Sequence, residues 1–119
     1  MSTHSGSTGV VIRDNHGGVI AASNKFLPHV ADAHMAEAWA LHDGLCLAQS
    51  IGTNKIVCQT DCLEVVTTMQ EGGFSATSAA TIYDECMRMW RDFTETSIKH
   101  GDRESEYGCS WFSKASFYF

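Results

Sequence analysis

The chain has 119 residues, of which 44% are hydrophobic and 18% are charged, as is ordinary for a packed globular domain. Its formal net charge of −6 disfavours electrostatic binding to nucleic acids, because their protein partners are usually basic. A single proline and no low-complexity tract exclude a disordered chain, and no apolar run approaches the ~20 residues of a membrane span. The N-terminal sequence MSTHSGSTG shows no secretory signal, so an intracellular protein, nuclear or cytoplasmic, is expected.

Two β-rich runs, residues 9–13 and 19–26, open the chain. Between them the sequence DNHGG supplies residues that tolerate turn geometry, and both Gly17 and Gly18 are free to take a positive φ. The two runs are therefore predicted to form an antiparallel hairpin.

Apolar side chains recur at helical spacing over residues 31–52, which predicts a long amphipathic helix. Asp32 is a suitable cap at its start, and Gly52 fits the position just past its end. Gly44 in the middle costs about 1 kcal/mol relative to alanine, so we interpret it as a mark of close packing against a sheet.

Short strands and helices alternate in the second half of the chain. The pattern predicts a strand at 55–60, helices at 61–72 and 79–93, and a last strand at 95–100. Residues 101–119 show no pattern that selects one element. The order ββαβααβ indicates the α/β class, with a mixed sheet in a single domain that spans residues 1–119.

The five cysteines form no CxxC pair, which argues against a zinc centre and for reduced, mostly buried thiols. The six histidines are scattered, and we interpret them as polar surface residues, including His34 and His42, which are eight residues apart. Cysteine and histidine therefore predict no metal site.

Four segments carry a resemblance when they are taken in order: GVVIRDNHGGVIAA, AEAWALHDGLCLAQSIG, KIVCQTDCLEVV and SIKHGDRES. Together they resemble the plant ribonuclease H-like domains of the type 1 ribonuclease H family. Many members of that group look like relics of retroelement reverse transcriptases. The resemblance covers residues 9–104, and its most specific parts are AEAWAL and the TD that follows an apolar strand.

The resemblance implies a ribonuclease H-like mixed sheet flanked by helices, and metal-dependent hydrolysis of the RNA strand of an RNA–DNA hybrid. In the family, four carboxylates hold two magnesium ions. Two metals about 4 Å apart activate the attacking water and stabilise the leaving oxygen, and magnesium prefers carboxylate oxygens. Mg²⁺ or Mn²⁺ is thus the cofactor expected of an active chain, and an RNA–DNA hybrid or another nucleic acid is the expected partner.

Two of the four family carboxylates have counterparts in this sequence. The helix glutamate of the family matches Glu37, and the aspartate at the end of a strand matches Asp61, so both are predicted catalytic metal ligands. The family's first aspartate belongs to an opening strand that is missing before residue 9, and no acid follows Glu106 to supply the fourth. His100 and Arg103 match a histidine and an arginine often found near the last family strand.

The missing opening strand is central in the family, between the hairpin and the strand at 55–60. Its loss leaves a gap that exposes unpaired backbone groups. Either the hairpin shifts inward, or a neighbouring chain or the atypical tail at residues 105–119 fills the space. The tail ends in WFSKASFYF, which is apolar, β-prone and nearly uncharged. A homo-oligomer is therefore expected, through an exposed strand edge or through this tail.

Asp61 also has a purely structural interpretation. The sequence DCLE at 61–64 fits a capping box, in which Asp61 accepts backbone N–H groups and Glu64 reaches back. Likewise, the helix dipole and solvent favour a glutamate such as Glu37 in the first turns of a helix.

Three functions stay open at this point. The chain is an active hybrid ribonuclease, an inactive module that binds protein or nucleic acid, or a truncated retroelement-derived product. With two of four carboxylates, we expect a ribonuclease H-like domain by ancestry with impaired or no catalysis.

Overall fold

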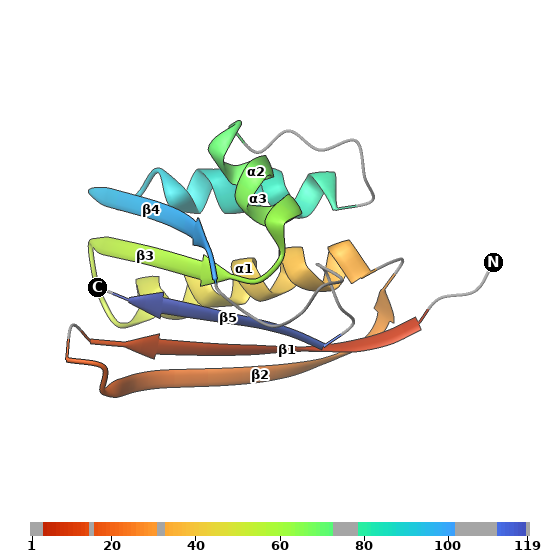
Figure 1. Cartoon of the computed structure of the whole chain (residues 1–119), viewed down its shortest axis with the longest axis horizontal. Helices are drawn as coiled ribbons and strands as arrows, with labels where there is room; N and C mark the ends of the chain where they lie inside the picture. The colour runs from red at the N-terminus through yellow and green to blue at the C-terminus, as the bar shows by residue number, and fades with distance from the viewer. Residues whose placement is uncertain (1–3, 15, 31–32, 73–78, 102–111, 119) are drawn as a thin grey trace.

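The computed structural model describes residues 4–14, 16–30, 33–72, 79–101 and 112–118 (Figure 1). Its elements, in chain order, are β1 (His4–Arg13), β2 (Val19–Val30), α1 (Ala33–Ser50), β3 (Lys55–Thr60), α2 (Leu63–Gln70), α3 (Ala80–Trp90), β4 (Glu95–His100) and β5 (Phe112–Tyr118). None of the helices in these ranges is long and apolar enough to span a membrane.

Five strands form one mixed sheet in the order β2-β1-β5-β3-β4. β1 pairs with β2 antiparallel, and β3 pairs with β4 parallel. The strand from the tail, β5, lies in the centre, parallel to β1 and antiparallel to β3 (Figure 1). It therefore occupies the position between hairpin and β3 where the resemblance implied a gap, and it joins the two halves of the sheet.

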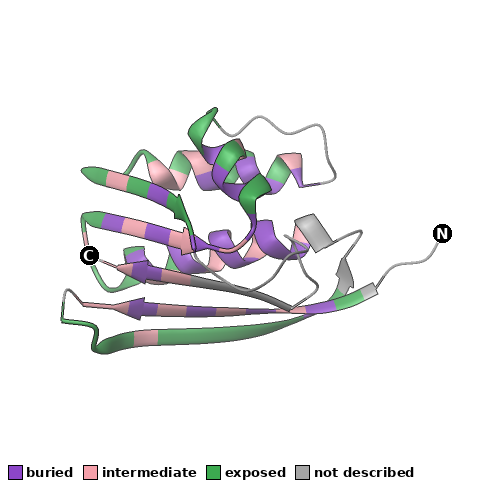
Figure 2. Cartoon of the chain, in the orientation of Figure 1, coloured by how far each residue is buried: buried purple, intermediate pink, exposed green. Residues whose placement is uncertain are grey.

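The helices cover one face of this sheet, as the burial of alternate strand residues shows (Figure 2). Along β1, Val10 and Ile12 are buried while Val11 is half-buried, and β3 alternates in the same way. α1 packs against β1, β2 and β5, and it also contacts α2 and α3. The core thus lies between the sheet and the three helices.

Gly44 of α1 lies directly over the central strand. A Cβ atom on this residue would come within 2.0 Å of Cε1 of Phe117, whose side chain is fully buried. The prediction that Gly44 marks close packing against a sheet is confirmed, since only glycine lets the helix approach the ring this closely.

The α/β prediction is confirmed, and so are the strands at Lys55–Thr60 and Glu95–His100. β1 begins at His4 and β2 ends at Val30, so both strands of the hairpin are longer than the runs predicted at 9–13 and 19–26. The added residues of β1 are polar, yet they form a strand because they pair with β2. Backbone hydrogen bonds between strands do not require apolar side chains. The predicted cap Asp32 lies outside the described residues.

The prediction of reduced thiols holds for most of the described cysteines. Cys46, Cys58 and Cys86 are free, whereas Cys62 is disulfide-bonded, so that prediction was wrong for Cys62. Nothing in the local sequence around Cys62 signalled this, because a disulfide depends on which segments the fold brings together.

Candidate active site

Glu37 is buried within α1, with only 2% of its surface exposed. A carboxylate seldom lies so deep in a protein unless other polar groups surround it. Its environment is shared with Tyr83 of α3, which is also buried. The alternative to a functional role was that Glu37 is a solvated residue of the first helical turns. Its burial contradicts that alternative.

The pKa of Tyr83 reports which charges lie around its hydroxyl. Burial raises this pKa most, and Cys86 raises it next. The negative charges of Glu37 and Glu64 raise it further, while a hydrogen bond with Thr68 lowers it. Glu37 from α1 and Glu64 from α2 therefore both act on one phenol of α3, and the three helices bring an acidic environment together.

Asp61 follows the last residue of β3 and is half-buried. The N-cap of α2 is Cys62, whose side chain makes no capping hydrogen bond, so the helix begins one residue later than the capping box headed by Asp61 predicts. Instead, the hydroxyl of Thr60 accepts a hydrogen bond of 3.2 Å from the backbone N–H of Cys62. The hydroxyl before Asp61 thus satisfies the backbone N–H of the residue at the N-cap.

His100 lies beside Asp61 because β3 and β4 are parallel. Their register pairs Thr60 with His100, so both strands end at the same edge of the sheet. The Nε2 atom of His100 is 3.2 Å from the carbonyl oxygen of Asp61, to which it donates when it carries its proton. Arg103, the other predicted neighbour, lies outside the described residues.

Magnesium needs several hard oxygen ligands, and only Glu37 and Asp61 match carboxylates of the family's metal centre. Across the ranges that the structure describes, no group of three or more His, Cys, Asp and Glu side chains is arranged to hold a metal ion. The carboxylates of Glu37 and Asp61 suit magnesium chemically. Two carboxylates do not amount to the four that two-metal hydrolysis in the family uses, so this donor set does not fit that centre.

The central strand and Tyr83 were not among the predicted site features. β5 has the sequence FSKASFY, which contains no acid, and it lies between β1 and β3. Tyr83 lies within the helix predicted at 79–93, and its proximity to Glu37 depends on how the helices pack. No local signal in one sequence could have revealed that proximity.

Comparison with known proteins identifies a family for nearly the whole chain. The model of the reverse transcriptase-like family matches residues 1–115. No curated protein sequence matches significantly.

Two solved structures share the fold. One is RNase H1 from the halophilic archaeon Halobacterium salinarum, which is 19% identical, with a TM-score of 0.69 over 85% of this chain and 86% of that one. The other is the N-terminal RNase H domain of a Mycobacterium tuberculosis protein, fused to maltose-binding protein. It is 17% identical, with a TM-score of 0.67 over 86% and 84% of the two chains. The chain belongs to the reverse transcriptase-like family and has the fold of ribonuclease H.

Proposed function

We propose that the chain is a ribonuclease H-like domain that retains nucleic-acid binding by ancestry, with RNA–DNA hybrids as the ancestral substrate, and that its cleavage is impaired or lost. The observation that carries this proposal is the composition of the central strand. In the family, the central strand brings the first catalytic aspartate. In this chain β5 lies between β1 and β3 and contains neither Asp nor Glu.

The remaining parts of the family site support the same proposal. Glu37 and Asp61 match two of the family's four metal ligands, and a pair of carboxylates does not fit the two-metal centre on which hydrolysis in the family depends. His100 would help to shape the edge of the site, because its ring contacts the backbone of Asp61. With two carboxylates, the affinity for a pair of magnesium ions should be low.

The net negative charge of the chain indicates that its binding to nucleic acid is weak. The chain has 8 basic and 14 acidic residues, so little counterion release is available to drive binding to a polyanion. We therefore propose weak binding to hybrids, by an intracellular protein of the nucleus or cytoplasm.

Hybrid cleavage with magnesium or manganese tests the proposal. The wild type, Asp61→Asn and Glu37→Gln should all give rates near the uncatalysed background. Asp84→Asn serves as a matched control, because Asp84 is an exposed acid on α3. Metal-dependent cutting that disappears in the first two variants and persists in Asp84→Asn would overturn the proposed loss of activity.

A second candidate is an inactive module that binds protein. It is favoured by the outer strand β2, an edge of the sheet on which Val19, Ile20 and Phe26 are exposed by 58%, 44% and 67%. Exposed apolar side chains on an open edge are typical of surfaces that pair with another strand. Phe117 of the tail is fully buried in the sheet, so its side chain is not available as a contact surface.

A further inference from the structure

His42 and Cys46 form a pair one helical turn apart on α1. The Sγ atom of Cys46 lies 3.8 Å from Nδ1 of His42. Residues four apart face the same side of a helix, so this contact follows directly from their spacing. Thiol and imidazole are the two protein ligands that soft and borderline metals prefer.

The other nitrogen of the His42 ring faces an acid from a different helix. Nε2 lies 3.2 Å from Oε1 of Glu85 on α3, within ion-pair distance but outside hydrogen-bond geometry. The Glu85 side chain is 54% exposed, so a small rotation aligns the two groups. The ring of Trp39 packs edge-on against His42, with the centroids 5.4 Å apart. These contacts fix the imidazole so that Nδ1 points toward Cys46.

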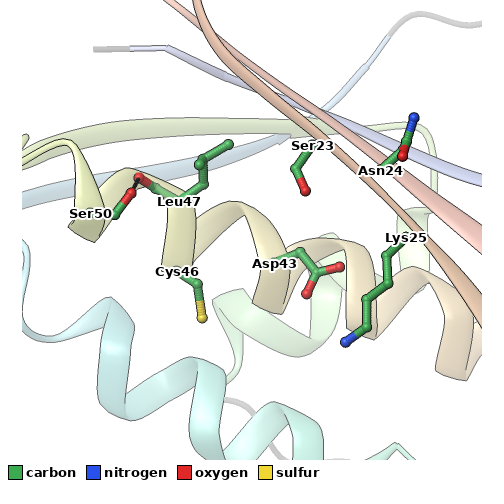
Figure 3. Close-up of a pocket in the computed structure, with 7 residues that line it drawn as sticks. All are labelled: Ser23, Asn24, Lys25, Asp43, Cys46, Leu47 and Ser50. Carbon is green, nitrogen blue, oxygen red and sulfur yellow. Dashed lines mark hydrogen bonds between the residues drawn. The ribbon is translucent and has the colours of Figure 1, made fainter.

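Cys46 is exposed, and it lines a hollow of about 360 Å³ between β2 and α1 (Figure 3). The other lining residues are Ser23, Asn24, Lys25, Asp43, Leu47 and Ser50. Figure 3 shows the thiol on the same side of α1 as the Asp43 carboxylate, with Lys25 extending from β2. An ion can therefore reach the sulfur from solvent.

We propose that His42 and Cys46 form a two-residue site for a divalent ion of the zinc class, with Glu85 orienting the imidazole. Bonds of about 2.3 Å to sulfur and about 2.0 Å to nitrogen at a tetrahedral angle would place these atoms roughly 3.5 Å apart. The observed 3.8 Å differs from that value by a few tenths of an ångström. The spacing therefore suits one ion held by both side chains.

Two protein ligands leave room for water or for a ligand from another molecule. The described residues contain no group of three metal-binding side chains, so the pair is an open site rather than a closed structural one. Two carboxylates near the pair favour a cation: Oε1 of Glu85 lies 3.2 Å from Nε2 of His42, and Asp43 lines the same hollow as Cys46. A metal displaces the thiol proton when it binds.

This site is separate in chemistry from the one around Glu37 and Asp61, which offers hard oxygen ligands. The outcome of its test therefore does not depend on whether the proposed function is correct. The sequence did contain a signal for it, namely the His42–Cys46 spacing, although the scattered histidines had been interpreted as surface residues.

Titration of the reduced, metal-free protein with Co²⁺ tests this site, because thiolate bound to cobalt gives a charge-transfer absorption band. We expect the band in the wild type, its displacement by Zn²⁺, and its loss in Cys46→Ser and His42→Gln. Glu85→Gln should weaken the affinity about 10- to 100-fold, as loss of a carboxylate behind a ligating histidine does. Asp84→Asn removes a neighbouring exposed acid and should leave the titration unchanged.

Cys46→Ser is the decisive variant, because an exposed position tolerates this exchange without unfolding. Absence of the band in the folded wild type would overturn the proposal, and so would a band that survives Cys46→Ser. An unchanged affinity in Glu85→Gln would overturn the orienting role of Glu85.

Discussion

Phe117 and Gly44 meet where helix α1 crosses the central strand. The ring is fully buried, and it occupies the space that any side chain at position 44 would need. A residue near the end of the chain and a glycine in its first half therefore depend on each other. This contact connects the unusual central strand to the helix that carries Glu37.

Gly44→Ala should destabilise the protein although alanine is the better helix former. The higher helix propensity of alanine alone favours the change by about 1 kcal/mol. However, a Cβ atom 2.0 Å from the Phe117 ring forces rearrangement of a packed core. Overpacking of this kind costs about 1–3 kcal/mol, so the free energy of unfolding should fall. Urea denaturation measures the difference.

Two further variants isolate the cause. Gln49→Ala makes a substitution to alanine on an exposed position of the same helix and should have little effect. Combining Gly44→Ala with Phe117→Leu should cost less than the sum of the single changes, because the smaller side chain relieves the clash. A stabilised Gly44→Ala protein would contradict the close approach.

Buried thiols give the protein a characteristic response to alkali. Burial, followed by the charge of Glu85, raises the pKa of Cys86 to about 12, and burial also raises the pKa of Cys58. In the unfolded chain both thiols ionise near pH 8.5. The unfolded state therefore loses these protons first, so the stability that they contribute is complete below about pH 8.5 and declines as pH rises toward 12.

We expect the free energy of unfolding to fall by about 1.4 kcal/mol per pH unit for each buried thiol above pH 9. Urea denaturation between pH 7.5 and pH 10.5 measures this slope. Cys58→Ala and Cys86→Ala should each make it shallower, whereas Cys46→Ala, at an exposed thiol, should change it less. A flat profile up to pH 10.5 would be inconsistent with protonated thiols in the core.

At the scale of elements, periodicity predicted most helices and strands, because each buries one face against the same core. The strand at Lys55–Thr60 alternates buried with less buried positions, which is a local signal, and in the strand at Glu95–His100 Ile98 is buried between exposed neighbours. β5 carries a weaker signal, because a central strand takes its partners from distant parts of the chain. Its β-prone composition was visible in the sequence, whereas its place between β1 and β3 was only one of three alternatives.

Because β5 is hydrogen-bonded on both sides, it should not tolerate proline. Ser116 pairs with Val11 of β1 and with Gln59 of β3. Ser116→Pro should lower the free energy of unfolding by more than about 3 kcal/mol, since the ring removes a donor and disrupts the strand on either side. Ser116→Thr, which suits a strand, is the matched control and should be close to neutral.

Thermal and urea unfolding of the two variants give the comparison. Pro28, by contrast, lies in β2 at the edge of the sheet, where a missing donor costs little. A Ser116→Pro protein as stable as the wild type would mean that β5 does not hold the two halves of the sheet together.

At the scale of the whole molecule, the candidate site was predictable only in part. Strand ends are visible in sequence, so Asp61 and His100 could be placed, and the parallel pairing of β3 with β4 explains why they meet. The surroundings of Glu37 were not predictable, because they depend on how α1, α2 and α3 pack. The start of α2 was predicted one residue too early, because Cys62 and not Asp61 is the N-cap, and helix boundaries are the least certain part of a prediction from sequence.

The open edge of the sheet should make the protein associate with a second copy of itself. β2 is the outer strand beside the hairpin partner β1, and its exposed Phe26 offers an apolar contact. Pairing of two β2 strands would satisfy their outward backbone groups and cover these side chains. Light scattering at increasing concentration should therefore detect a dimer, and Phe26→Lys should shift the equilibrium toward the monomer.

Leu63→Lys is the matched control for this association, because Leu63 is 57% exposed on α2, away from the sheet edge. Removing that apolar side chain should leave the dimer intact if pairing runs through β2. Equal weakening by both variants would indicate general hydrophobic association instead of strand pairing. A monomer that persists at the highest concentrations would show that Lys25 and Pro28, both edge-blunting residues of β2, already suffice to prevent pairing.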